Sequence, residues 1–95
     1  MKETQVRLKE LTGAMQKVLL EKNRRYGDSA LNPLGVFSPL TAVDAIRIRL
    51  DDKLKRIKNG PPVPRTNDVC DLIGYCFLLL AANNVEPEEI LALID

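Results

Sequence analysis

The stretch TNDVCDLIGYCFLLLAA, residues 66–82, is the most apolar part of the chain and predicts its central element. A helix drawn through it carries apolar side chains nearly all round. Helices of that kind are normally buried between others. Thr66 and Asn67 are both residue types that favour helix N-caps. We therefore expect a buried central helix here, covered by the rest of the chain.

Two amphipathic helices are predicted before it. The first spans about residues 3–25, and the second begins near Pro39 or Leu40 and ends near Asn59-Gly60, where three closely spaced prolines forbid its continuation. Gly13 interrupts the first helix pattern and predicts either a close helix contact or a kink. In each helix, apolar residues recur at spacings of three, four and seven and form an apolar stripe along one face. The stripe of the first helix is Leu8, Leu11, Met15, Val18 and Leu19, and that of the second is Val43, Ile46, Leu50, Leu54 and Ile57.

A short fourth helix is expected from about Pro87 to Leu93, because proline and glutamate suit a helix N-terminus. The fold class predicted is all-α: one domain, residues 1–95, forming a small bundle of three long helices plus a short C-terminal helix. Aromatic residues make up only 4% of the chain and tryptophan is absent, so the core is thin. We expect a homo-oligomer for that reason.

The connection between the first two helices, residues 26–39, is long for a compact bundle. Four apolar side chains in it are candidate anchors that would pack the loop down as a lid or a dimer contact. They are Leu31, Leu34, Val36 and Phe37.

Composition narrows the function classes. The net charge of +1 and the pI of about 7.7 argue against non-specific nucleic-acid binding. The chain has no histidine, the commonest acid–base group. Cys70 and Cys76 lie six apart in one predicted helix, which suits free thiols in a reducing compartment better than a disulfide. No signal peptide or membrane-spanning stretch is visible, so we expect a cytoplasmic protein without a membrane partner.

Three polar residues interrupt the apolar helix. Asp68, Asp71 and Tyr75 follow the spacing i, i+3 and i+7, so they share one helix face. Asp68 is either a first-turn acid favoured by the helix dipole or a ligand. Asp71 is either half of a structural ion pair, with Arg47, Lys53 or Arg56, or a functional ligand.

Basic residues supply the matching charge. Lys53 and Arg56 flank the stripe of the second helix and either form a solvated face or hold phosphate. Lys22 ends the first helix, where cations complement the dipole or reach a ligand. Tyr26 could stack on a base. Gly27, followed by Asp28, could let the backbone come close to the bound ligand.

The order of these motifs resembles a phage and bacterial nucleotide-modification-associated helical family, which looks related to MazG-like nucleoside triphosphate pyrophosphatases. The likeness covers roughly residues 15–82. It rests on three elements: Lys22-Asn-x-x-Tyr-Gly-Asp28, Ile48 with Lys53-x-x-Arg56-Ile57, and Asp71-Leu-Ile-Gly-Tyr75.

The resemblance implies an oligomeric, all-α protein that handles nucleotides, with Mg²⁺ bound by Asp68 and Asp71 as the catalytic pair. It also implies that Lys22, Lys53 and Arg56 hold phosphates, and that Tyr26 and Tyr75 contact base or sugar. The Glu-Glu-x-x-Glu element of MazG-like enzymes is missing from the sequence.

Three functions therefore stay open. The first is Mg²⁺-dependent hydrolysis of a (deoxy)nucleoside triphosphate in phage nucleotide metabolism. The second is a binding protein that sequesters a nucleotide, including a cyclic signalling nucleotide, without turnover. The third is a structural module whose interface is formed by the 26–39 loop.

Overall fold

Residues 2–95, which the computed structural model describes, form four α-helices and one short 3-10 helix, with no strand among them. The all-α prediction is confirmed. The elements are α1 (Lys2–Arg25), α2 (Ala42–Lys58), α3 (Thr66–Ala82), α4 (Pro87–Leu91) and the 3-10 helix η1 (Ala92–Ile94).

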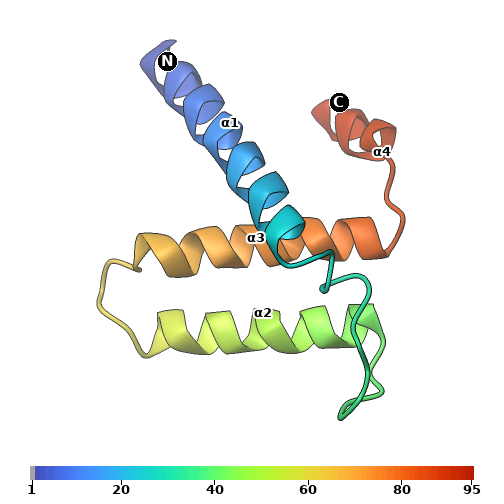
Figure 1. Cartoon of the computed structure of the whole chain (residues 1–95). Coiled ribbons are helices and arrows are strands. Elements are labelled where there is room, and N and C mark those ends of the chain that lie inside the picture. The colour runs from blue at the N-terminus through green and yellow to red at the C-terminus, as the bar shows by residue number, and fades with distance from the viewer. Residues whose placement is uncertain (1) are drawn as a thin grey trace.

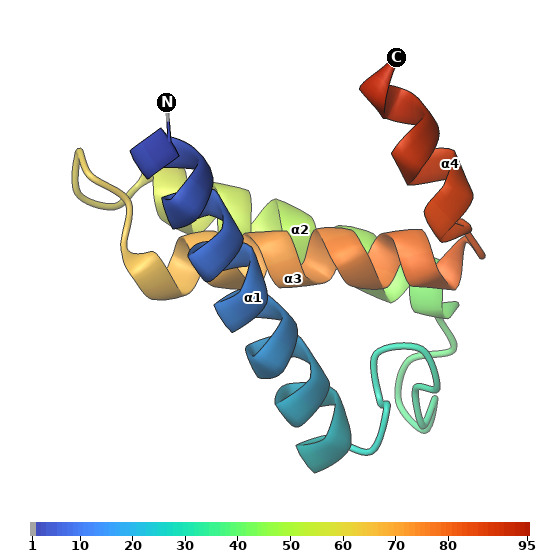
Figure 2. The same ribbon diagram turned by 90° about the horizontal axis from the view of Figure 1, so that it is seen from above.

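The long helices α2 and α3 lie side by side and antiparallel, joined by a loop at one end (Figure 1). Helix α1 crosses α3 (Figure 2), and its N-terminal half rises away from the α2–α3 pair (Figure 1). Helix α4 lies beyond the C-terminal end of α3 and packs with η1.

No single helix within residues 2–95 is long and apolar enough to cross a membrane. Helix α3 and the segment Pro87–Ile94 would together have that length and apolar character, but they are bent by 120° at their junction.

Gly74 sets the crossing of α1 over α3. It is buried, and a Cβ atom placed on it would lie 3.1 Å from Cδ2 of Leu19. Only a glycine lets α1 come this close without displacing that side chain. At Gly13, by contrast, a Cβ atom would meet nothing within 4 Å in the described part of the chain, and α1 runs through it unbroken. The close contact is thus found at Gly74 rather than at Gly13.

Helix α2 begins later than the sequence predicts. Its N-cap is Thr41, whose Oγ1 accepts a hydrogen bond from the backbone N–H of Asp44 at 3.2 Å. The prediction of a start at Pro39 or Leu40 was wrong, because the threonine hydroxyl satisfies an orphan donor of the first turn. The predicted end is confirmed, with Asn59 as the C-cap.

The N-cap of α3 is also displaced from the prediction. Arg65 holds that position in an extended conformation and makes no capping hydrogen bond with its side chain. Thr66 and Asn67 are already inside the helix. The last helix is split, since α4 ends at Leu91 and η1 continues to Ile94.

The expectation that α3 is buried all round was wrong for one side of the helix. Val69, Ile73 and Phe77 are 36%, 37% and 50% exposed. Ile46 is the one apolar side chain that is fully buried in the described residues. The connecting loop does not pack down either: Leu34, Val36 and Phe37 are largely or wholly exposed, and Leu31 is half-buried.

Candidate functional site

Asp71 joins the three long helices through its charge. Its Oδ1 accepts a hydrogen bond from Nζ of Lys22 on α1 at 3.3 Å, and its Oδ2 lies 3.0 Å from Nζ of Lys53 on α2. The side chains of Asp71 and Lys53 are mostly buried, whereas that of Lys22 is half exposed. Three segments that are far apart in the sequence therefore meet at one carboxylate, and Lys22 is the partner on its solvent-exposed side.

The charge on Asp71 is stabilised in the folded chain. Partial burial raises the pKa of this carboxyl, but the interactions with Lys53 and then Lys22 outweigh it, so the pKa lies below its ordinary value. Of the three partners considered from the sequence, Lys53 is found on Asp71. Lys22 is a second partner that the sequence did not assign to it.

Asp68 ties the start of α3 to the end of α2. Its side chain is almost completely buried, with Oδ1 at 3.3 Å from Nε of Arg56 and Oδ2 at 3.8 Å from Nη1 of Arg65. Oδ1 receives no hydrogen bond of regular geometry from the described residues, so the contact with Arg56 is mainly electrostatic. A buried carboxylate without such cations would be costly. The two arginines give Asp68 a structural role.

An open hollow of about 500 Å³ lies along α2, next to this cluster. Four basic side chains and one acidic side chain give it a positive character that favours anions. Its volume is in the range of small-molecule sites. The lining residues are Arg49, Asp52, Lys53, Lys55, Arg56 and Asn59.

Lys53 and Arg56 connect the hollow with Asp71, which is partly buried, and with Asp68, which is buried. Arg56 uses Nε on Asp68, and its side chain is 58% exposed. A guanidinium has further N–H donors in a planar fork, which matches phosphate oxygens. Arg56 can therefore face a bound anion while its Nε keeps the contact with Asp68.

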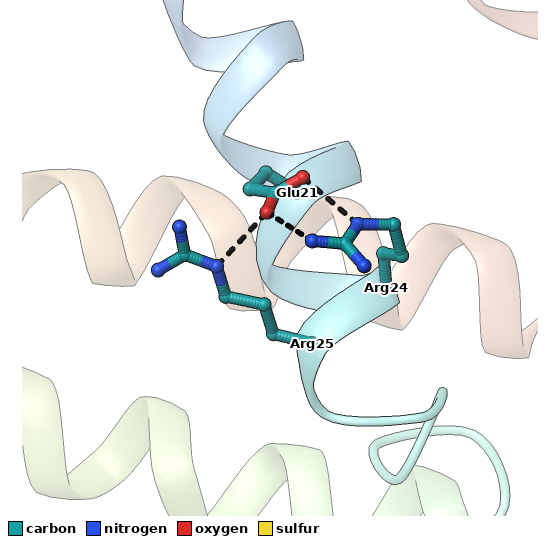
Figure 3. Close-up of polar contacts among 3 residues, drawn as sticks. All are labelled: Glu21, Arg24 and Arg25. Carbon is teal, nitrogen blue, oxygen red and sulfur yellow. Dashed lines mark hydrogen bonds and ion pairs between the residues drawn. The ribbon is translucent and has the colours of Figure 1, made fainter.

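The end of α1 carries a second charged cluster. Glu21 accepts from Arg24 through Nε at 3.1 Å and Nη2 at 2.6 Å, and from Arg25 through Nε at 2.9 Å (Figure 3). These hydrogen bonds, that from Arg24 first, hold the pKa of Glu21 below its usual value and raise that of Arg24. The sequence reasoning missed this fork, although the spacings of three and four residues signal it.

Asp28 organises the turn after α1. It adopts a positive φ of 58° and accepts hydrogen bonds from Nδ2 of Asn23 at 2.9 Å and of Asn32 at 2.6 Å. Gly27 also has φ of 58°, and Tyr26 is 67% exposed. Between these three residues and Asp71 or Lys53, the structure of residues 2–95 shows no hydrogen bond or ion pair. Tyr26, Gly27 and Asp28 lie in the turn directly after α1, and the backbone N–H of Tyr26 donates a hydrogen bond to the carbonyl of Lys22 at 3.0 Å.

Tyr75 is half-buried on α3, one helical turn after Asp71. The structure thus brings together Lys22, Lys53 and Asp71, and places Arg56 with Asp68 beside them. The contribution of Arg65 was missed from the sequence. Its separation of three residues from Asp68 is the signal that could have indicated it.

Magnesium, which the resemblance implies, would be held through Asp68 and Asp71. Each of these carboxylates already faces two cationic side chains. Within residues 2–95 no three acidic or cysteine side chains lie close enough together to hold a metal ion. Magnesium binds carboxylate oxygens in a strict octahedral geometry, so it would have to displace these cations. The two carboxylates in their present arrangement therefore do not fit a magnesium ion, and the groups of the site that could bind a ligand are its lysines and arginines.

Comparison of the chain with protein-family models, with curated proteins and with solved structures finds no match.

Proposed function

We propose that the chain is a nucleotide-binding protein that holds the phosphates of its ligand in the basic hollow on α2. The observation that carries this proposal is the junction at Asp71, where Lys22 and Lys53 converge from two other helices beside that hollow. The ion pair with Asp71 holds Lys53 at the lining of the hollow, which Arg49, Lys55 and Arg56 also line, and a phosphate group can interact with several of these cations at once.

The nucleotide part of the proposal comes from the sequence resemblance, whose motifs include Lys53, Arg56 and Asp71. The positive hollow supports an anionic ligand, and its volume of about 500 Å³ accommodates more than a single phosphate. Binding without turnover is the better-supported version. Asp68 and Asp71 are both engaged by cations, which favours binding of an anion over metal-assisted chemistry at these carboxylates.

Calorimetric titration tests the proposal. The ligands are the ribo- and deoxynucleoside triphosphates, a cyclic dinucleotide, and inorganic pyrophosphate as a probe without a base, each with and without magnesium. We expect saturable binding of at least one nucleotide in the absence of magnesium. Release of pyrophosphate from a triphosphate in the presence of magnesium would instead establish the hydrolase.

A charge-matched pair of double variants locates the site. Arg49→Ala with Lys55→Ala removes two cations from the lining of the hollow. Arg47→Ala with Lys58→Ala removes two exposed cations of the same helix that do not line it. The first pair is expected to weaken binding about tenfold or more, and the second less than about threefold. Equal losses in the two variants would show that only the overall charge matters, and would reject the hollow as the site.

A further inference from the structure

The single chain exposes far more surface than a folded monomer of its mass. Its accessible surface is 8062 Å². A monomeric protein of 10.6 kDa is expected to expose about 5,500 Å², so the excess is about 2,600 Å². The radius of gyration, 15.2 Å, also exceeds the value of about 12 Å for a compact domain of this length. The open arrangement of α1 and the projecting C-terminal segment, both visible in Figures 1 and 2, contribute to both differences, as does the exposed 26–39 loop.

Part of this exposed surface is apolar and lies on one side of α3. Successive residues of a helix are rotated by about 100°, which places five residues on the side turned away from α2. They form the open face of α3: Val69, Ile73, Cys76, Phe77 and Leu80. A shallow hollow of about 230 Å³ on this face has no charged lining residue; Leu72, Ile73, Cys76, Phe77 and Leu80 line it.

The stripe of α1 continues this apolar surface. Leu19 packs against Gly74 of α3, and the stripe extends from there into the N-terminal half of α1, which rises past the other helices (Figure 1). In that extension Leu8 and Leu11 are 56% and 51% exposed, and Val18, next to Leu19, is 42% exposed. Helix α1 and the open face of α3 together form an apolar corner.

We propose that this corner is the interface with a second copy of the chain. Ile46 is the one fully buried apolar side chain of the described residues, so a single copy has almost no core of its own. If each copy covered half of its excess surface, the interface would total about 2,600 Å², which lies in the range of obligate homodimers. A patch without charges raises no repulsion when it meets itself across a two-fold axis, as an isologous interface requires.

The proposal is tested by sedimentation equilibrium of the full chain and of two matched variants. Phe77→Glu puts a carboxylate on the open face of α3. Phe37→Glu makes the same change in the 26–39 loop, where the side chain is wholly exposed. The wild type is expected to sediment as a dimer or a multiple of one. Phe77→Glu is expected to raise the dissociation constant about a hundredfold or more, because it buries an unpaired charge. Phe37→Glu should leave association unchanged.

A monomeric wild type at about 100 µM would overturn the proposal, whatever other partner the corner then binds. An oligomer that Phe37→Glu dissociates and Phe77→Glu does not would place the interface in the loop, and would overturn it equally. Circular dichroism shows whether Phe77→Glu keeps its helices.

The wild type alone provides a second readout, which holds even if that variant fails to fold. Cys76 is exposed on the open face in a single copy. Its alkylation by iodoacetamide should slow at least about tenfold as the protein concentration is raised through the association range, and should be fast in urea. Rapid alkylation at every concentration would contradict a covered face.

Discussion

At the scale of single residues, Asp71 explains how two lysines come to lie beside each other. Two ammonium groups repel one another, and the carboxylate between Lys22 and Lys53 compensates for this. The carboxylate is therefore best understood as the group that positions the cations.

Replacement of Asp71 by asparagine removes this compensation while keeping the shape of the side chain. We expect a loss of about 1–3 kcal/mol in the free energy of unfolding at neutral pH, between the values typical of exposed and buried pairs. Urea unfolding measures it, and Asp51→Asn, an exposed acid on α2, is the control. A loss no larger than that of the control would show that the junction contributes nothing to stability.

The pH dependence of this loss follows from the pKa of Asp71, which folding lowers. The unfolded chain, with an ordinary carboxyl pKa of about 3.9, then binds more protons than the folded chain in the window below that value. The contribution of Asp71 is present above about pH 4 and is lost as the pH falls through the lower pKa of the folded state. The stability difference between wild type and Asp71→Asn should shrink over that window, and a constant difference down to acid pH would argue against the ion pairs.

At the scale of elements, the start of α2 depends on one hydroxyl. Thr41→Ala removes the acceptor of the Asp44 N–H and should lower the free energy of unfolding by about 1 kcal/mol. Ser38→Ala, three residues earlier and outside the helix, is the matched control and should have little effect. Equal urea midpoints for the two variants would show that the cap is unimportant.

Two glycines give opposite predictions in their helices. Alanine at either position gains about 1 kcal/mol in helix propensity. At Gly13 nothing in the described chain opposes the gain, whereas at Gly74 the new methyl group would lie 3.1 Å from Leu19. Gly13→Ala should therefore be more stable in urea than wild type, and Gly74→Ala should be less stable than Gly13→Ala. The reverse order would mean that α1 does not cross α3 at this glycine.

The helices themselves were predictable, because periodicity and turn residues are local signals. The end of α2 at Asn59 follows from the glycine and prolines after it. Its start was misplaced, since proline and threonine both favour helix starts and only the hydrogen bond to Asp44 decides between them. The exposure of Phe77 could not be predicted, because it depends on which neighbours cover α3 and not on its composition.

At the scale of the whole molecule, the ion pairs were partly predictable. The sequence indicated that Asp71 needs a cation and named Lys53 among the candidates. It did not reveal that Lys22 reaches the same carboxylate, because that depends on the angle at which α1 crosses α3 (Figure 2).

The open shape gives a further prediction about stability. If a second copy completes the core, unfolding includes dissociation, and the thermal midpoint depends on protein concentration. We expect the midpoint to rise by several degrees over a hundredfold increase in concentration, as measured by circular dichroism or calorimetry. A midpoint independent of concentration would indicate that one copy folds alone.

The most direct test of nucleotide binding at the hollow is a two-dimensional ¹H–¹⁵N NMR titration of the full chain with each nucleoside triphosphate in turn. Saturable shifts of the amide signals should centre on residues 49–59 of α2 and extend to Lys22 and Asp71. The same shifts should be lost in Arg49→Ala/Lys55→Ala and kept in Arg47→Ala/Lys58→Ala. An absence of saturable shifts, or shifts confined to the open face of α3, would contradict a phosphate site at the junction of the three helices.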